Sequence, residues 1–131
     1  IIQGGPDVGQ YTSSGTFESS VIDANGTAGF NRFTADVTVP AQTTLKVQVG
    51  VAAPVNNSCT GAVYTFIGPN PNDYINSYFT PVGSVISGAV PMTINQDYTN
   101  PNRCFKYKAF LDTLDNVYTP TLQDFTVNYS P

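Results

Sequence analysis

Two cysteines, Cys59 and Cys104, are the residues whose chemistry the sequence restricts most closely. The chain of 131 residues contains no other cysteine and no histidine. A cysteine nucleophile wants a histidine as its base, and a structural zinc site wants four Cys or His ligands. A disulfide between the two is therefore predicted, and two buried free thiols are the alternative. A disulfide would place the protein outside the cytosol.

The nine carboxylates are scattered along the chain rather than paired. A glycosidase needs two carboxyl groups facing each other about 5 to 9.5 Å apart across a cleft. Nothing in the spacing of these acids requires such a pair. We therefore expect the protein to have no catalytic residues and not to be an enzyme.

One turn gathers Asp112, Asp115 and Asn116. Calcium takes oxygen ligands of this kind from loops, so the turn is a candidate calcium site. Aspartate and asparagine are also ordinary turn formers that bond their own backbone. Both interpretations stay open, and no other cofactor is expected.

Eight tyrosines could include a platform for sugars, because an aromatic face matches the apolar face of a pyranose ring. The best candidates lie in two polar, proline-containing loops: Asp73 with Tyr74, and Tyr98 with Asn100. The alternative is that these tyrosines pack in the core or across strands.

The composition excludes some partners. Only 11% of the residues are charged, and five basic residues stand against nine acidic ones, which gives a formal net charge of −4. Nucleic-acid binding wants a basic stripe, which this chain does not have. No apolar run approaches about 18 residues, so we expect no membrane contact by this domain.

The elements that must position these residues follow period-two alternation, which is typical of β-strands. Alternation predicts strands over residues 17–23, 33–39, 45–51, 102–111 and 121–129, with a turn over 24–29. Leu45, Val47, Val49 and Val51 should share one inward face. Shorter strands are expected over 62–67, 74–80, 84–86 and 90–94, and no segment has helical period. The predicted fold is all-β: one antiparallel, jelly-roll-like β-sandwich over residues 10–131, after a connecting segment over 1–9.

The order of several motifs resembles a family of secreted bacterial β-sandwich domains, the globular ends of type IV pilin-like or pseudopilin-like subunits. The motifs include Tyr-Thr-Phe-Ile-Gly-Pro (64–69) and Asn-Arg-Cys-Phe-Lys-Tyr-Lys (102–108). The others are residues 10–23, 30–33, 40–49, 77–80 and 119–124. Pilin-like subunits begin with a long apolar assembly helix, which this sequence lacks. Either that helix has been removed, or the domain belongs to another surface protein.

The resemblance implies a non-enzymatic, extracellular domain at the cell surface. Its function would be assembly or adhesion, and its partners would be other filament or surface subunits. The alternative is a carbohydrate-binding module, accessory to a secreted enzyme, whose partner would be a glycan.

Overall fold

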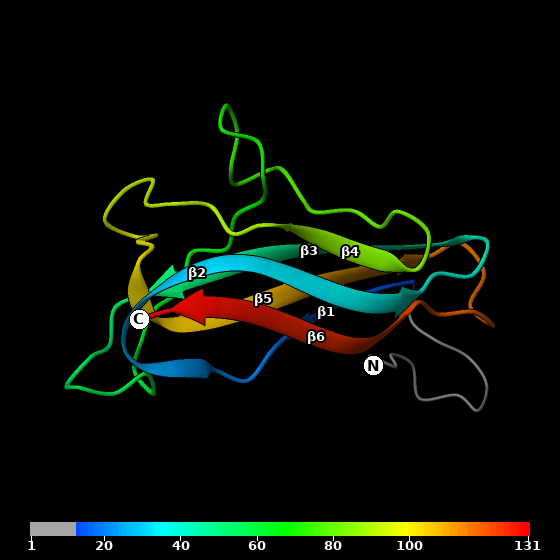
Figure 1. Ribbon diagram of the computed structural model, residues 1–131. Helices are drawn as coiled ribbons and strands as arrows, with labels where there is room; N and C mark the ends of the chain where they lie inside the picture. Colours follow the sequence, from blue (N-terminus) through cyan, green and yellow to red (C-terminus); the bar gives the residue numbers. More distant parts are fainter. Residues whose placement is uncertain (1–12) are drawn as a thin grey trace.

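The computed structural model (Figure 1) describes residues 13–131. Its six strands are β1 (Ser14–Glu18), β2 (Ile22–Thr38), β3 (Thr43–Ala52), β4 (Val85–Ala89), β5 (Asn102–Thr113) and β6 (Thr121–Ser130). Strand β2 organises the fold: its first residues pair with β5, and the rest of the strand pairs with β4 and β6. Strand β5 in turn pairs with β1 and β3, and every pairing is antiparallel.

The all-β prediction is confirmed: residues 13–131 contain antiparallel strands and no helix. It follows that no helix in this part of the chain could cross a membrane. The jelly-roll sandwich arrangement stays a prediction. The connecting segment expected over 1–9, and the domain boundary at residue 10, lie outside the described residues.

The core forms where alternating side chains of β2 and β3 turn inward. Leu45, Val47, Val49 and Val51 are at most 2% exposed, so the predicted register of β3 is confirmed. In β2, Phe33, Ala35 and Val37 are buried, and the residues between them are exposed. Full burial of each larger aliphatic or aromatic side chain contributes about 1.5–3 kcal/mol.

Aromatic rings join β5 to β2 and β6 across this core. The ring centres of Phe105 (β5) and Phe30 (β2) lie 5.1 Å apart. The ring of Tyr107 (β5) stacks on that of Phe125 (β6), with 3.9 Å between the ring centres. Phe125 also stacks on Phe33 at 5.2 Å. Such ring pairs add about 0.5–1.5 kcal/mol each beyond the area that they bury. Side chains of β2, β5 and β6 therefore meet in one apolar cluster.

The predictions for residues 17–29 are wrong in detail. β1 ends at Glu18 and β2 starts at Ile22, so the expected strand over 17–23 is two strands with a break between them. The expected turn over 24–29 lies inside β2. Its pairing with β5 jumps from Asp23 opposite Cys104 to Ala28 opposite Asn102, which is a bulge. Turn-forming residues here bend a strand instead of ending it.

The long connection between β3 and β4 covers the outer face of β3. The strands expected over 62–67 and 74–80 are single bridges, Ile67 to Val49 and Phe79 to Val47, and no strand forms over 90–94. The strand expected over 84–86 is present as β4. Gln48, on the face of β3 opposite Val47 and Val49, is buried and donates to the carbonyls of residues 75 and 77 (both 2.8 Å). Both faces of β3 are therefore covered from Gln48 to Ala52.

Candidate functional site

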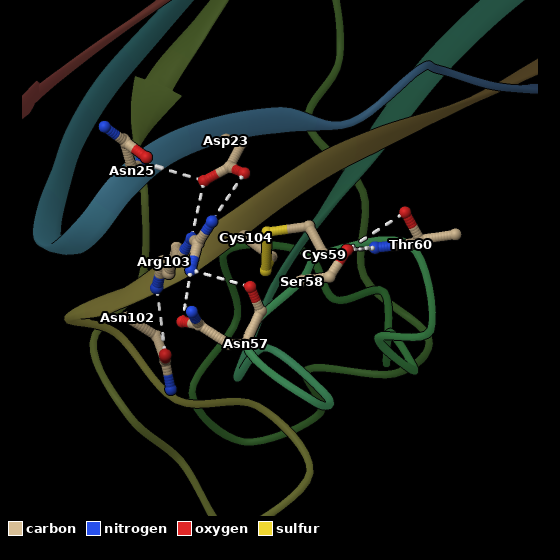
Figure 2. A network of polar contacts seen from close by, with 9 residues as sticks. All are labelled: Asp23, Asn25, Asn57, Ser58, Cys59, Thr60, Asn102, Arg103 and Cys104. Carbon is tan, nitrogen blue, oxygen red and sulfur yellow. Dashed lines mark hydrogen bonds and ion pairs between the residues drawn. A yellow bond between two sulfur atoms is a disulfide. The ribbon is translucent and has the colours of Figure 1, made fainter.

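The predicted disulfide is present at the start of β5. Cys59 and Cys104 are joined with a Cα–Cα distance of 5.7 Å, inside the usual range for disulfides. Both cysteines are buried. The bond ties the connection after β3 to the neighbouring strand β5, as Figure 2 shows.

Arg103 reinforces the disulfide from the neighbouring position (Figure 2). Its Nε and Nη2 donate to the two carboxylate oxygens of Asp23, at 2.8 and 3.1 Å. Its Nη1 donates to the backbone carbonyl and to Oδ1 of Asn57, at 3.2 and 3.1 Å. The Arg103 guanidinium, and then the backbone N–H of Asn25, hold the pKa of Asp23 below its usual range. We call the disulfide and this network the stapled end.

Two of the predicted sugar contacts, Tyr98 and Asn100, lie in the core at the same end. Both are 0% exposed. Asn100 donates to the carbonyls of Phe30 and Pro91 (both 2.9 Å) and accepts from the N–H of Phe30 (3.0 Å). The hydroxyl of Tyr98 donates to the carbonyl of Pro91 (2.7 Å), and burial raises the pKa of Tyr98. Their burial corrects the prediction, because a ligand cannot stack on a ring that no solvent reaches.

The other two predicted contacts, Asp73 and Tyr74, lie on the surface. Asp73 is exposed and its carboxylate accepts from the backbone and side chain of Asn76. Tyr74 is half-buried and lines a groove of about 490 Å³ between β4 and the preceding connection. We call it the tyrosine groove; its other lining residues are Pro69, Pro71, Tyr78, Phe79, Thr80, Ser87, Gly88, Ala89 and Pro91.

Tyr78, which sequence reasoning did not single out, is held in this groove by its neighbours. The ammonium of Lys46 lies 3.9 Å from the centre of its ring, and Phe110 meets the ring edge-on at 5.2 Å. Lys46 is on β3 and Phe110 is on β5, so both sit on the outer face of the sheet. Lys46 alternates with apolar residues as a solvent-facing residue does, so no local pattern indicated that Tyr78 would cover it.

The structure places the candidate calcium residues around one turn but uses one of them locally. Oδ1 of Asp115 accepts from the N–H of Val117 (3.2 Å), and its carbonyl accepts from the hydroxyl of Thr113 (2.7 Å). Asp112 is exposed at the end of β5, and Asn116 is exposed in the turn. Within residues 13–131, no group of three or more His, Cys, Asp or Glu side chains is arranged to hold a metal. Calcium at this turn stays a prediction.

The end of the molecule opposite the stapled end carries exposed apolar side chains. Three loops meet there, residues 39–42, 81–84 and 114–120, at the right of Figure 1. Leu114 is 87% exposed and Val82 is 85% exposed, and Val117 and Tyr118 are about half exposed. Hollows of about 290 and 360 Å³ lie beside loop 39–42, the first against Leu114 and the second against Pro81. We call this surface the apolar loop end.

A comparison of the chain with protein-family models, with curated proteins and with solved structures found no match in any of the three. The function is therefore argued from the geometry of these surfaces.

Proposed function

We propose that this domain is the extracellular, non-enzymatic part of a pilin-like surface or filament subunit, and that it acts in assembly or adhesion. The observation that carries the proposal is the apolar loop end. Two strongly exposed apolar side chains and two that are about half exposed are concentrated in neighbouring loops, where water meets them at a free-energy cost. A partner surface that covers them would recover about 25 cal/mol for each Å² of apolar area removed from water.

The scaffold supports a binding role for these loops. Strands flank loops 39–42 and 114–120, and loop 81–84 lies between the bridge of Phe79 to Val47 and strand β4. Hydrogen bonds also join the loops: the N–H of Leu114 donates to the carbonyl of Gln42 at 2.7 Å. Loops on a rigid scaffold bind without a large ordering cost. The disulfide supports an extracellular location, because such bonds persist in oxidising compartments.

The experiment compares two substitutions in the full-length subunit expressed in cells. Leu114→Ser removes an exposed apolar side chain from the apolar loop end. Val63→Ser removes one that is 81% exposed elsewhere and serves as the matched control. We expect Leu114→Ser to reduce incorporation into surface filaments or adhesion of the cells, and Val63→Ser to leave both unchanged. Equal behaviour of the two variants would refute the role of this surface.

The second candidate function, a carbohydrate-binding module, is favoured by the tyrosine groove. The groove has the size of a small-molecule site and combines aromatic rings with hydroxyl groups of Thr80 and Ser87. Asp73, next to Tyr74 in sequence but outside the lining of the groove, has an exposed carboxylate that could accept from sugar hydroxyls.

A glycan-array screen with and without calcium tests this candidate. Saturable binding that is lost in Tyr74→Ala and kept in Tyr118→Ala, a control tyrosine at the apolar loop end, would support the carbohydrate-binding function. Binding that also needs calcium would be followed by substitution of Asp112, Asp115 and Asn116 to test whether they hold the ion. No binding in either condition would leave assembly or adhesion as the proposal.

A further inference from the structure

The bulge in β2 contains Asn25-Gly26, the one place in the sequence where asparagine precedes glycine. Residues 24–27 have no partner in the pairing between β2 and β5, and Arg103 alone stands between the flanking pairs on β5. The segment therefore does not pair with β5, although β2 continues before and after it.

Both groups of this dipeptide are accessible. Asn25 is exposed and its φ of 61° is in the left-handed region, which asparagine tolerates better than most residues. Its backbone N–H donates to Oδ1 of Asp23 (2.8 Å), but no other residue in 13–131 forms a hydrogen bond with its side-chain amide. Gly26 is exposed, and a Cβ added to it would meet nothing within 4 Å, so the space around this residue is open.

We propose that Asn25 is a site of spontaneous deamidation, an age-dependent covalent modification that goes beyond the proposed function. The backbone nitrogen of Gly26 attacks Cγ of Asn25 and loses its proton. The N–Cγ bond forms, the bond from Cγ to the side-chain nitrogen breaks, and ammonia leaves with that proton. Water then opens the cyclic imide at one of its two carbonyls, which leaves aspartate or isoaspartate. Glycine favours ring closure because it has no side chain to obstruct the nitrogen.

The modification would act on the stapled end. Asn25 lies beside the Asp23–Arg103 pair, and Arg103 also holds Asn57 in the loop that contains Cys59 (Figure 2). A new carboxylate at position 25 adds a negative charge next to Asp23, and isoaspartate also adds a methylene to the backbone of the bulge. Each change competes with the geometry in which Arg103 grips Asp23.

Asn57-Ser58 provides an internal control in the same network. Asn57 has nearly the same φ, 60°, and is also exposed. Its Oδ1 accepts from Arg103, however, and the N–H of Ser58 donates to the carbonyl of Val55 (3.1 Å). Both reacting groups are therefore engaged, and Ser58 carries a side chain. Asn57 should keep its amide much longer than Asn25.

The experiment incubates the folded, disulfide-bonded protein in mildly alkaline buffer and follows each asparagine by peptide mapping and mass spectrometry. We expect the peptide with Asn25 to gain the mass of replacing NH₂ by OH, several-fold faster than the peptide with Asn57. An isoaspartyl methyltransferase should label the product. Gly26→Ala, which has room for its methyl group, should slow the conversion several-fold. Equal rates at Asn25 and Asn57, or an unchanged rate in Gly26→Ala, would overturn the proposal.

Discussion

The two ends of strand β5 show opposite ways of finishing a β-domain. At its start, the stapled end uses a disulfide, an ion pair and a buried asparagine to fix the loops. Beyond its last residue, Thr113, the apolar loop end fixes the backbone through hydrogen bonds such as Leu114 to Gln42, and leaves apolar side chains in water.

The difference separates stability from recognition. Residues that make covalent, ionic or buried polar contacts within the domain stabilise the fold and are not available to bind a partner. Exposed apolar side chains on a fixed backbone contribute little to folding and are available for binding. Substitutions at the two ends should therefore have different consequences for stability.

The largest loss should follow removal of the disulfide. The double variant Cys59→Ser/Cys104→Ser opens a loop with a sequence separation of 45, which corresponds to about 4 kcal/mol in the chain-entropy model. Denaturant unfolding of the variant and of the native protein, with and without reductant, measures the difference. Reductant should weaken the native protein to the level of the variant and leave the variant unchanged. A loss below about 1 kcal/mol would mean that the non-covalent contacts alone hold this end.

The next largest loss should come from Asn100→Ala. The substitution leaves the N–H and carbonyl of Phe30 without their side-chain partner in a site from which water is excluded. Unsatisfied buried polar groups cost about 1–3 kcal/mol each, so a total near 3 kcal/mol is expected from denaturant unfolding. Asn76→Ala, whose side chain bonds Asp73 on the surface, is the control and should change little. Similar losses in both variants would contradict the role given to Asn100.

Asn100 also shows where sequence reasoning stops. Alternation located β3, β5, β6 and most of β2, because every second residue of a strand with one buried face is apolar. The burial of Asn100 depends on Phe30, 70 positions away, and no local pattern reports that contact. A tyrosine and an asparagine among prolines therefore indicated a surface loop, although they fill the core.

The burial of the outer face of β3 could not be predicted either, because it also depends on residues far away in the sequence. Lys46 and Gln48 alternate with the core residues as solvent-facing residues do, yet the connection before β4 covers them. The disulfide was predictable because the sequence has no histidine and no further cysteine, so neither a zinc site nor a cysteine nucleophile could explain the two thiols. The apolar loop end was not predicted, since single apolar residues in loops carry no periodic signal.

The Asp23–Arg103 pair should make the free energy of unfolding depend on pH. Arg103 lowers the pKa of Asp23 in the folded protein below its value in the unfolded chain. The pair therefore contributes stability above the ordinary pKa of aspartate, and this contribution is lost as the pH falls through the lowered folded value. The unfolding free energies of the native protein and of Asp23→Asn should differ at neutral pH and converge in strong acid. If the unfolding free energies still differ at the lowest pH, the contribution of the pair does not depend on the charge of Asp23.

The smallest change should come from Val117→Asn at the apolar loop end. Val117 is 55% exposed, and its N–H already bonds Asp115, so the substitution removes little buried area and no backbone hydrogen bond. Surface changes of this kind stay within about 0.5 kcal/mol, and denaturant unfolding should show the native midpoint and slope. A larger loss would mean that Val117 packs inside the domain and is not available to a partner. An unchanged unfolding curve, combined with weaker assembly or adhesion in the full-length subunit, would separate recognition at this end from stability at the other.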